Sequence, residues 1–163
     1  MAPFVVIGEF MFVDKSKSLS QLFYERWKSI VFKFCLLVTG NQSRAEESTA
    51  EGFIEYARQG GEVCGPEVPP TLLKFALRAT QKSFSPPPLE FRLKTLQYSI
   101  FTLPTSERVA FAIRHALNLP LSTAALVLEV STEEATMLCF SALMRLRESL
   151  PDHFYGRSEW NLV

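Results

Sequence analysis

The sequence predicts an all-α protein made of two small helical modules joined by a proline-rich linker. Three observations lead to this fold class. Apolar residues recur three or four positions apart through each long segment, as they do along one face of a helix. Helix caps and turn residues separate these segments. Three consecutive prolines, Pro86 to Pro88, interrupt the chain near its middle and favour an extended, semi-rigid spacer, so we place the module boundary near Ser85–Pro88.

The first expected helix, Gln21–Val38, is amphipathic and closes at Thr39-Gly40, because glycine is common at helix C-termini. Its apolar residues are Leu22, Phe23, Trp27, Ile30, Val31, Phe34 and Leu37, and we expect Trp27 to lie in the core. Ser43 is the expected cap of a second helix, with the sequence RAEESTAEGFIEYARQG. The loop Gly60–Pro70 then separates this helix from the next one.

A third helix is expected over Thr71–Lys82. Lys74, Arg78 and Lys82 fall at positions i, i+4 and i+8 and so form one basic stripe along it. Such a stripe is suited to holding phosphates through salt-dependent contacts that read no sequence. The alternative is an ordinary solvated helix face.

The segment Leu103–Leu150 reads as three consecutive helices, which a further helix over about Leu89–Phe101 precedes. The first begins with Thr105 or Ser106 as N-cap and runs to about Ala116, and the second spans Ser122–Leu128. Glu129-Val130-Ser131 is the turn, and Ser131 caps the third helix in a capping box with Glu134. This is the layout of a helix-turn-helix, in which the second helix of the pair enters the major groove of DNA.

These segments resemble the extracytoplasmic-function sigma factors. The match to region four of that family rests on Leu103-Pro104, Arg108, Arg114-His115, Ala125, Leu128, Val130-Ser131, Ala142 and Leu146-Arg147. The match of the second helix to region two rests on Ala45, Glu46, Glu47, Glu51, Phe53 and Tyr56. The segment Thr71–Lys82 is similar to the promoter-melting helix of region two. The sequence departs from the family pattern at several positions: Thr123-Ala124 replace Glu-Ile, Glu129 replaces the turn glycine, Glu134-Ala135 replace Thr-Val, Ser48-Thr49 replace two apolar residues, and Ala50 stands where the family prefers Gln.

The resemblance implies partners and contact residues. The polar face of the second helix would dock on the clamp helices of RNA polymerase core. The residues expected there are Glu46, Glu47, Ala50, Glu51 and Glu55. The basic helix and the recognition helix would approach promoter DNA. The contacts expected there are Lys74, Arg78, Lys82, Ser131, Thr132, Thr136 and Arg145. An anti-sigma protein is the regulator that the family implies.

The charge distribution does not favour DNA binding by the recognition helix. Lys plus Arg equals Asp plus Glu at 17 each, so the chain lacks the basic excess of many nucleic-acid binders. The helix also begins with acids, Glu133 and Glu134, which phosphates repel. Its apolar residues Met137, Leu138, Phe140 and Met144 offer adaptable contacts to a partner helix. The alternative is that this helix is more deeply buried, in its own domain or against the first module.

Composition excludes several other classes of protein. No stretch approaches the about 18 uninterrupted apolar residues of a transmembrane helix, and no secretory pattern is present, so we expect a cytoplasmic protein without membrane insertion. Three cysteines and two histidines at unrelated spacings predict neither disulfides nor a metal site. No nucleophile or carboxylate stands at motif spacing from His115 or His153, and no glycine-rich phosphate loop follows a strand. We therefore expect no enzyme activity and no cofactor.

The expected organisation divides the chain into five parts. Residues 1–10 are an extension added for expression, or alternatively a native apolar strand or arm. Residues 11–84 form the polymerase-binding module, 85–102 the linker and connecting helix, and 103–150 the helix-turn-helix module. Residues 151–163 form a tail whose Trp160 is expected to pack on its own domain rather than anchor a partner.

These observations favour a sigma-like transcription initiation protein that binds RNA polymerase core and promoter DNA under the control of an anti-sigma partner. The alternative is a degenerate sigma mimic that binds an anti-sigma factor or polymerase without reading promoters. A third hypothesis is a helical DNA-binding regulator that uses only the C-terminal module. Salt-dependent retention on DNA would distinguish the DNA-binding classes from the mimic.

Overall fold

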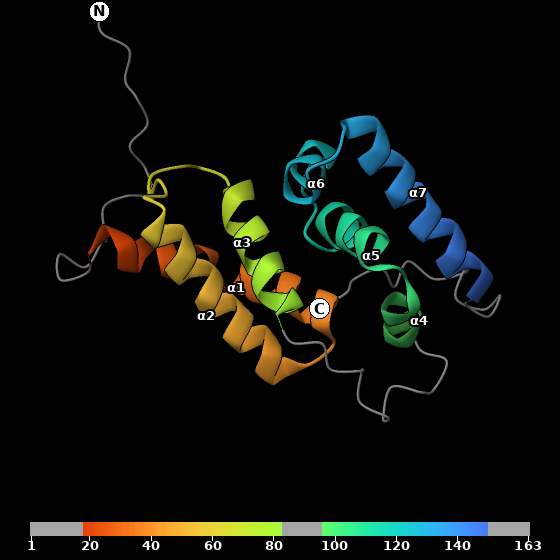
Figure 1. Ribbon diagram of the computed structural model, residues 1–163, viewed down its shortest axis with the longest axis horizontal. Coiled ribbons are helices and arrows are strands. Elements are labelled where there is room, and N and C mark those ends of the chain that lie inside the picture. The colour runs from red at the N-terminus through yellow and green to blue at the C-terminus, as the bar shows by residue number, and fades with distance from the viewer. Residues whose placement is uncertain (1–17, 83–95, 150–163) are drawn as a thin grey trace, which may run out of the picture.

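The computed structural model describes residues 18–82 and 96–149, which form seven α-helices and one π-helical segment and no β-strand (Figure 1). The all-α class predicted from the sequence is confirmed for these residues. Residues 18–82, the N-terminal part, contain α1 (Leu19–Thr39), α2 (Gln42–Arg58) and α3 (Pro70–Gln81). Residues 96–149, the C-terminal part, contain α4 (Leu96–Thr102), α5 (Thr105–Phe111), the π-helical segment Ala112–Ala116, α6 (Leu121–Leu128) and α7 (Thr132–Ser149).

Polar caps and one glycine set the ends of the first two helices. The Ser18 side chain accepts a hydrogen bond from the Gln21 amide at the start of α1. Gly40 ends α1 with a left-handed φ of 66°, and a Cβ there would lie 2.6 Å from the ring of Phe101, so glycine is required on both counts. Asn41 rather than Ser43 caps α2, because its side chain accepts from the Arg44 amide at 3.0 Å.

Helices α1, α2 and α3 pack on one another, and α2 approaches α3 closely at Gly52. A Cβ at Gly52 would lie 2.9 Å from the Cβ of Ala76, so a larger residue would push the two helices apart. Ser48 and Thr49 face this interior and are buried, and the Thr49 hydroxyl donates to the Ala45 carbonyl at 2.6 Å. Ser48 and Thr49 therefore belong to the core and not to the outer face of α2.

The C-terminal part contains the predicted helix-turn-helix. Helices α6 and α7 pack on each other and on α5, and residues 129–131 form the turn between them. The Ser131 hydroxyl accepts from the Glu134 amide at 3.1 Å, as the capping motif predicts. Helix α5 starts after Pro104 without a side-chain cap, so neither Thr105 nor Ser106 is the cap.

The two parts share one hydrophobic core. Helix α3 packs on α6, and α1 contacts α4, α5 and the π-helical segment (Figure 1). The main cluster of buried residues takes members from both parts, including Phe34, Leu72, Val109, Ile113 and Val127. A second, smaller cluster around Ile100, Phe111 and Leu146 joins α4, α5 and α7. Each part therefore completes the apolar interior of the other.

Several sequence-based expectations lie outside the described residues. They are the extension at residues 1–10, most of the proline-rich linker, the start of the helix expected at Leu89 and the tail with Trp160. Within residues 18–82 and 96–149, every helix is too short or too polar to cross a lipid bilayer.

Candidate functional site

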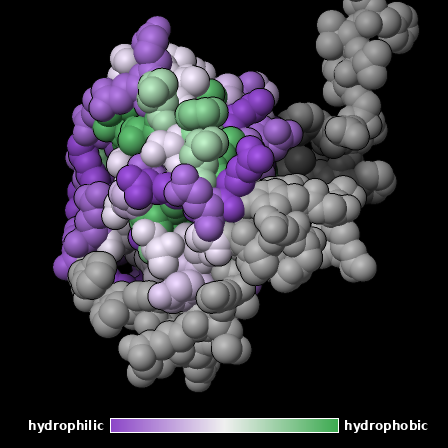
Figure 2. All heavy atoms as spheres, turned by 90° about the vertical axis from the view of Figure 1, so that its right-hand side faces the viewer, coloured by the Kyte–Doolittle hydropathy of each residue, from purple (hydrophilic) through white to green (hydrophobic). Residues whose placement is uncertain are grey.

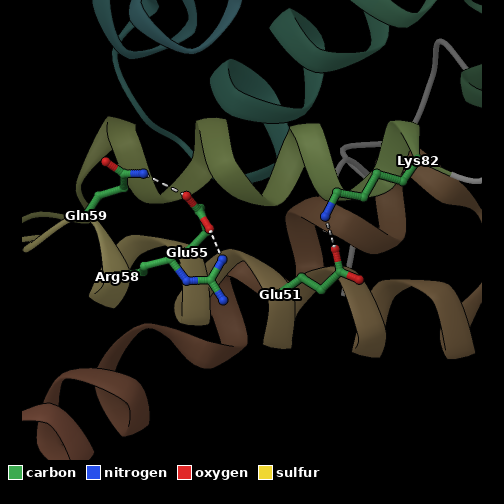
Figure 3. A network of polar contacts seen from close by, with 5 residues as sticks. All are labelled: Glu51, Glu55, Arg58, Gln59 and Lys82. Carbon is green, nitrogen blue, oxygen red and sulfur yellow. Dashed lines mark hydrogen bonds and ion pairs between the residues drawn. The ribbon is translucent and has the colours of Figure 1, made fainter.

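The basic stripe of α3 lies against one carboxylate from α2 and one from the turn between α6 and α7. Lys74 Nζ lies 2.6 Å from Glu129 Oε1, and Arg78 Nη2 lies 3.5 Å from Glu129 Oε2. Lys82 Nζ lies 2.8 Å from Glu51 Oε2 on α2 (Figure 3). All three predicted DNA-binding cations of α3 are therefore paired with an acid. The two pairs that involve Glu129 join the N-terminal part to the C-terminal part.

Glu129 has an unusual backbone conformation for a residue other than glycine. It lies at φ 60° and ψ 41°, in the left-handed region where a Cβ is unfavourable and where glycine is the common residue. Its pKa is lowered by the hydrogen bond from Lys74, and further by the charges of Lys74 and Arg78. The residue at the turn position where the sigma-factor pattern has glycine is thus the one that pairs with two of the three cations of the basic stripe.

The residues predicted to dock on polymerase lie together on α2. Glu46, Glu47, Ala50 and Glu51 are exposed, and Glu55 is half-buried. Glu55 accepts hydrogen bonds from Gln59 at 2.8 Å and Arg58 at 2.9 Å (Figure 3). The bond from Gln59 is the main cause of its lowered pKa. The structure therefore presents a row of carboxylates along one exposed side of α2.

The acidic row and the basic stripe meet at an open groove between α2 and α3. Its lining residues are Glu51, Ile54, Glu55, Arg58, Phe75, Arg78, Ala79 and Lys82. Ile54 is 58% exposed, so an apolar side chain stands between the charged residues of α2. Ile54 is not among the contact residues predicted from the sequence, because a single apolar residue on a helix surface is common and does not by itself mark a contact site.

The leading turn of α7 is exposed. Ser131, Thr132 and Thr136 all face solvent, and the Thr136 hydroxyl donates to the Thr132 carbonyl at 2.7 Å. Glu133 and Glu134 are exposed beside them. This turn therefore presents hydroxyls and carboxylates but no cation to an approaching ligand.

Arg145, the remaining predicted DNA contact, is held by a buried acid of α5. Its Nε lies 3.0 Å from Glu107 Oε2, and the Ser141 hydroxyl donates to Glu107 Oε1 at 2.9 Å. Glu107 is only 6% exposed and needs a positive partner there. Arg145 thus balances the charge of buried Glu107. The spacing of residues along α7 could not predict this partner, because Glu107 lies on α5.

Arg108 joins α5 to the end of α1. Its guanidinium donates to the carbonyls of Val38 at 2.7 Å, Phe101 at 2.8 Å and Leu103 at 2.9 Å. Burial lowers the pKa of this guanidinium. The family resemblance included Arg108 without a role, and the structure shows that it connects the two parts of the chain.

Three apolar side chains of α7 form an exposed stripe, which we call the α7 stripe: Met137, Phe140 and Met144. Met137 is 66% and Phe140 58% exposed, whereas Leu138 is half-buried. The alternative that the helix buries these residues is therefore wrong for all three. Figure 2 faces the side of the molecule on which α7 lies and shows apolar residues among hydrophilic ones.

The described residues contain no cluster of three or more His, Cys, Asp or Glu side chains placed to bind a metal ion, and Cys35, Cys64 and Cys139 are free thiols. No protein-family model matches the chain, and no curated protein matches its sequence.

Proposed function

We propose that the chain is a sigma-like transcription initiation factor, similar to the extracytoplasmic-function sigma factors. The observation that carries the proposal is the α6–α7 helix-turn-helix, capped by Ser131, in one chain with an exposed row of acids on α2. In this proposal residues 11–84 are the polymerase-binding module and residues 103–150 the promoter-reading module. The proline-rich residues between them are the connection.

The mechanism would consist of binding and strand separation, without covalent chemistry. Glu46, Glu47, Ala50, Glu51 and Glu55 would dock on RNA polymerase core. The stripe of α3 would hold phosphates of the downstream promoter element, and α7 would approach the upstream element. An anti-sigma protein would compete for these surfaces.

The ion pairs of α3 add a condition to this mechanism. A promoter phosphate has to replace the Glu129 carboxylate at Lys74 and Arg78, which lie 2.6 and 3.5 Å from it. Since the Glu129 side chain is 62% exposed, we expect DNA to engage α3 after this side chain has rotated away from Lys74 and Arg78. The arrangement described here would then be the form of the protein that is not bound to promoter DNA.

Titration into core RNA polymerase, followed by transcription from a library of promoter fragments, tests the proposal. Glu47→Lys reverses a charge at the centre of the acidic row, whereas Glu51→Lys would also break the pair with Lys82. We expect Glu47→Lys to weaken polymerase binding by tenfold or more. Glu67→Lys, at an exposed position of the loop before α3, is the control and should bind normally. Equal affinity of all three proteins would remove α2 as the docking face.

Salt dependence tests the DNA contacts. If Lys74, Arg78 and Lys82 touch phosphates, their joint replacement by Ala should reduce the slope of log affinity against log salt by up to about 0.9 per lost contact. Glu129→Gln keeps all three cations and removes the carboxylate that competes with DNA phosphates for Lys74 and Arg78. We therefore expect this variant to bind DNA more tightly. An unchanged slope in the triple variant would show that Lys74, Arg78 and Lys82 do not contact DNA.

A second candidate function is a degenerate sigma mimic, which occupies an anti-sigma protein or polymerase without reading promoters. Specific observations favour it: the cations of α3 are paired with acids, the first turn of α7 is acidic, and the α7 stripe is exposed. Polymerase or anti-sigma binding that persists in high salt, with no promoter-dependent transcript, would identify the mimic.

A further inference from the structure

The α7 stripe has no role in the promoter and polymerase contacts proposed above. Met137, Phe140 and Met144 are three and four residues apart, so they follow one side of the helix. The residues that α7 buries against the rest of the fold lie on its opposite side: Ala135, Cys139, Ala142 and Leu146. The stripe is therefore on the side of α7 that a further helix can approach.

A charged residue of opposite sign continues the stripe at each of its ends. Glu133 precedes Met137 by four residues and Arg147 follows Met144 by three, and both charged residues are exposed. At 3.6 residues per turn, these positions and Phe140 fall within an arc of about 80°. Alternate spacings of four and three residues are those of the contact seam between paired helices. This seam of α7, from Glu133 to Arg147, has an acid at one end, three apolar side chains in the middle and a base at the other end.

The order of these residues makes the seam complementary to itself when two copies of α7 lie antiparallel. Glu133 and Arg147 each stand seven residues from Phe140, which is about 10.5 Å along the helix. A two-fold axis through Phe140 brings together positions at equal distances on its two sides, because a two-fold contact uses the same surface twice. Glu133 of each copy then faces Arg147 of the other. Met137 of one copy faces Met144 of the other, and the two Phe140 rings meet at the axis.

Arg147 can serve both its own chain and a second copy. It has an interaction within its own chain. A guanidinium carries five N–H donors, however, so it can bind a second acceptor without giving up the first. The pairs with Glu133 would lie in contact with water, so they set the relative direction of the two helices more than the strength of the contact. The apolar middle of the seam supplies most of the stabilisation.

The size of the seam predicts a weak dimer. The exposed fractions are 66% for Met137, 58% for Phe140 and 39% for Met144, so these side chains offer on the order of 300 Å² of apolar surface in each copy. Stable dimers bury about 800 Å² on each partner, whereas smaller contacts belong to transient complexes. We therefore expect a dissociation constant of roughly 10–100 µM.

We propose that α7 pairs with α7 of a second copy, antiparallel and centred on Phe140, in a weak symmetric dimer of the full chain. Thr136 lies one turn before Phe140, so the dimer also covers this predicted DNA contact. Self-association and the binding of DNA or another protein to this side of α7 then exclude each other. The inference goes beyond the proposed function and does not depend on it, because it concerns only copies of this chain.

Sedimentation equilibrium of the full chain, from about 1 to 300 µM, tests the association. We expect a dimer whose population rises with concentration. Phe140→Asp places two carboxylates at the two-fold axis and should raise the dissociation constant by about tenfold or more. Ile54→Asp is the matched control, because Ile54 and Phe140 are both 58% exposed and Ile54 lies on α2. The control should dimerise normally, and circular dichroism establishes that both variants fold.

Charge reversals at low salt test the antiparallel order. Glu133→Lys places a lysine opposite Arg147 in both pairs of the dimer, and Arg147→Glu places two acids opposite each other. Each single variant should therefore dimerise several-fold more weakly than the unaltered chain. The double variant, Glu133→Lys with Arg147→Glu, has opposite charges in both pairs again and should recover the original dissociation constant. In a parallel dimer like charges already face each other, so the single variants would dimerise as the unaltered chain does.

Three results would overturn the proposal. A chain that stays monomeric at about 300 µM leaves the α7 stripe to a different partner. A dimer that Phe140→Asp and Ile54→Asp weaken equally uses another surface. A double variant as weak as the two single variants, or single variants as strong as the unaltered chain, excludes the antiparallel pairing of Glu133 with Arg147.

Discussion

Arg108 and Glu129 both join the N-terminal and C-terminal parts of the molecule, but in opposite surroundings. Arg108 is half-buried and donates to three backbone carbonyls, one of them from α1. Glu129 is exposed and contacts the side chains of Lys74 and Arg78 on α3. Contacts removed from water are costly to break, whereas exposed ion pairs contribute little and weaken in salt. The molecule therefore has one firm connection and one that a competing anion can replace.

The buried connection should show the largest effect. Arg108→Leu leaves the carbonyls of Val38, Phe101 and Leu103 without their charged donor, and we expect the free energy of unfolding to fall by about 3 kcal/mol. Urea denaturation followed by circular dichroism measures it. Arg114→Leu, at an exposed position just after α5, should change stability by less than about 0.5 kcal/mol. If both variants lost the same free energy of unfolding, the contacts of Arg108 would not be a firm connection between the two parts.

The pair Arg145–Glu107 should fall between the two connections, because one partner is exposed and the other buried. Arg145→Ala leaves the Glu107 carboxylate with only Ser141 beside it, at a cost of about 1–2 kcal/mol. Arg114→Ala, at an exposed position of the π-helical segment, should cost much less. Adding Glu107→Gln to Arg145→Ala should recover part of the loss, and failure to recover it would show that the charge of Glu107 is not the cause.

The exposed connection should respond weakly, and in a direction that depends on the substitution. Glu129→Gln loses the ion pairs but keeps a side chain in the left-handed region, so we expect a small fall in Tm. Glu129→Gly loses the same pairs but relieves the backbone, so its Tm should lie above that of Glu129→Gln. Calorimetry in low salt compares them. A loss as large as that of Arg108→Leu would mean that the two connections do not differ.

The smallest effect concerns pH. The pKa of Glu129 is lowered in the folded protein by Lys74, so its contribution to stability is present above the ordinary carboxyl pKa near 4.5. That contribution disappears as the pH falls through the lowered pKa. The stability difference between the unaltered chain and Glu129→Gln should be constant near neutral pH, shrink below about pH 4.5, and shrink also in high salt. If this stability difference grew below pH 4.5, the ionised Glu129 carboxylate would not be the form that stabilises the fold.

Local patterns in the sequence predicted the helices well. Residues 132–149 follow a Ser131 cap, and Gly40 ends α1, since each of these signals acts within a few neighbouring residues. The misplaced caps at Ser43 and Thr105 or Ser106 are errors of one or two positions, of the size expected at helix ends. The π-helical turn Ala112–Ala116 has no distinguishing pattern and was read as ordinary helix.

The partners of the candidate site residues were not predictable in the same way. Lys74 and Arg78 meet Glu129 across 55 and 51 positions of the sequence, and Arg145 meets Glu107 across 38. Helical spacing places residues on a common face but does not say which element that face meets. The sequence places Glu129 in the predicted turn, yet only the packing of α3 on α6 explains what its carboxylate contacts.

The shared core has a consequence for how the chain is made. A ribosome releases the N-terminal part first, with Phe34 and Leu72 of its interior still lacking the neighbours that Val109, Ile113 and Val127 later provide. Until roughly residue 127 has emerged, this apolar surface of the nascent chain is exposed, so that it can bind chaperones or aggregate. The same dependence limits recombination between genes, because a foreign second half would lack the apolar surface that matches the N-terminal part.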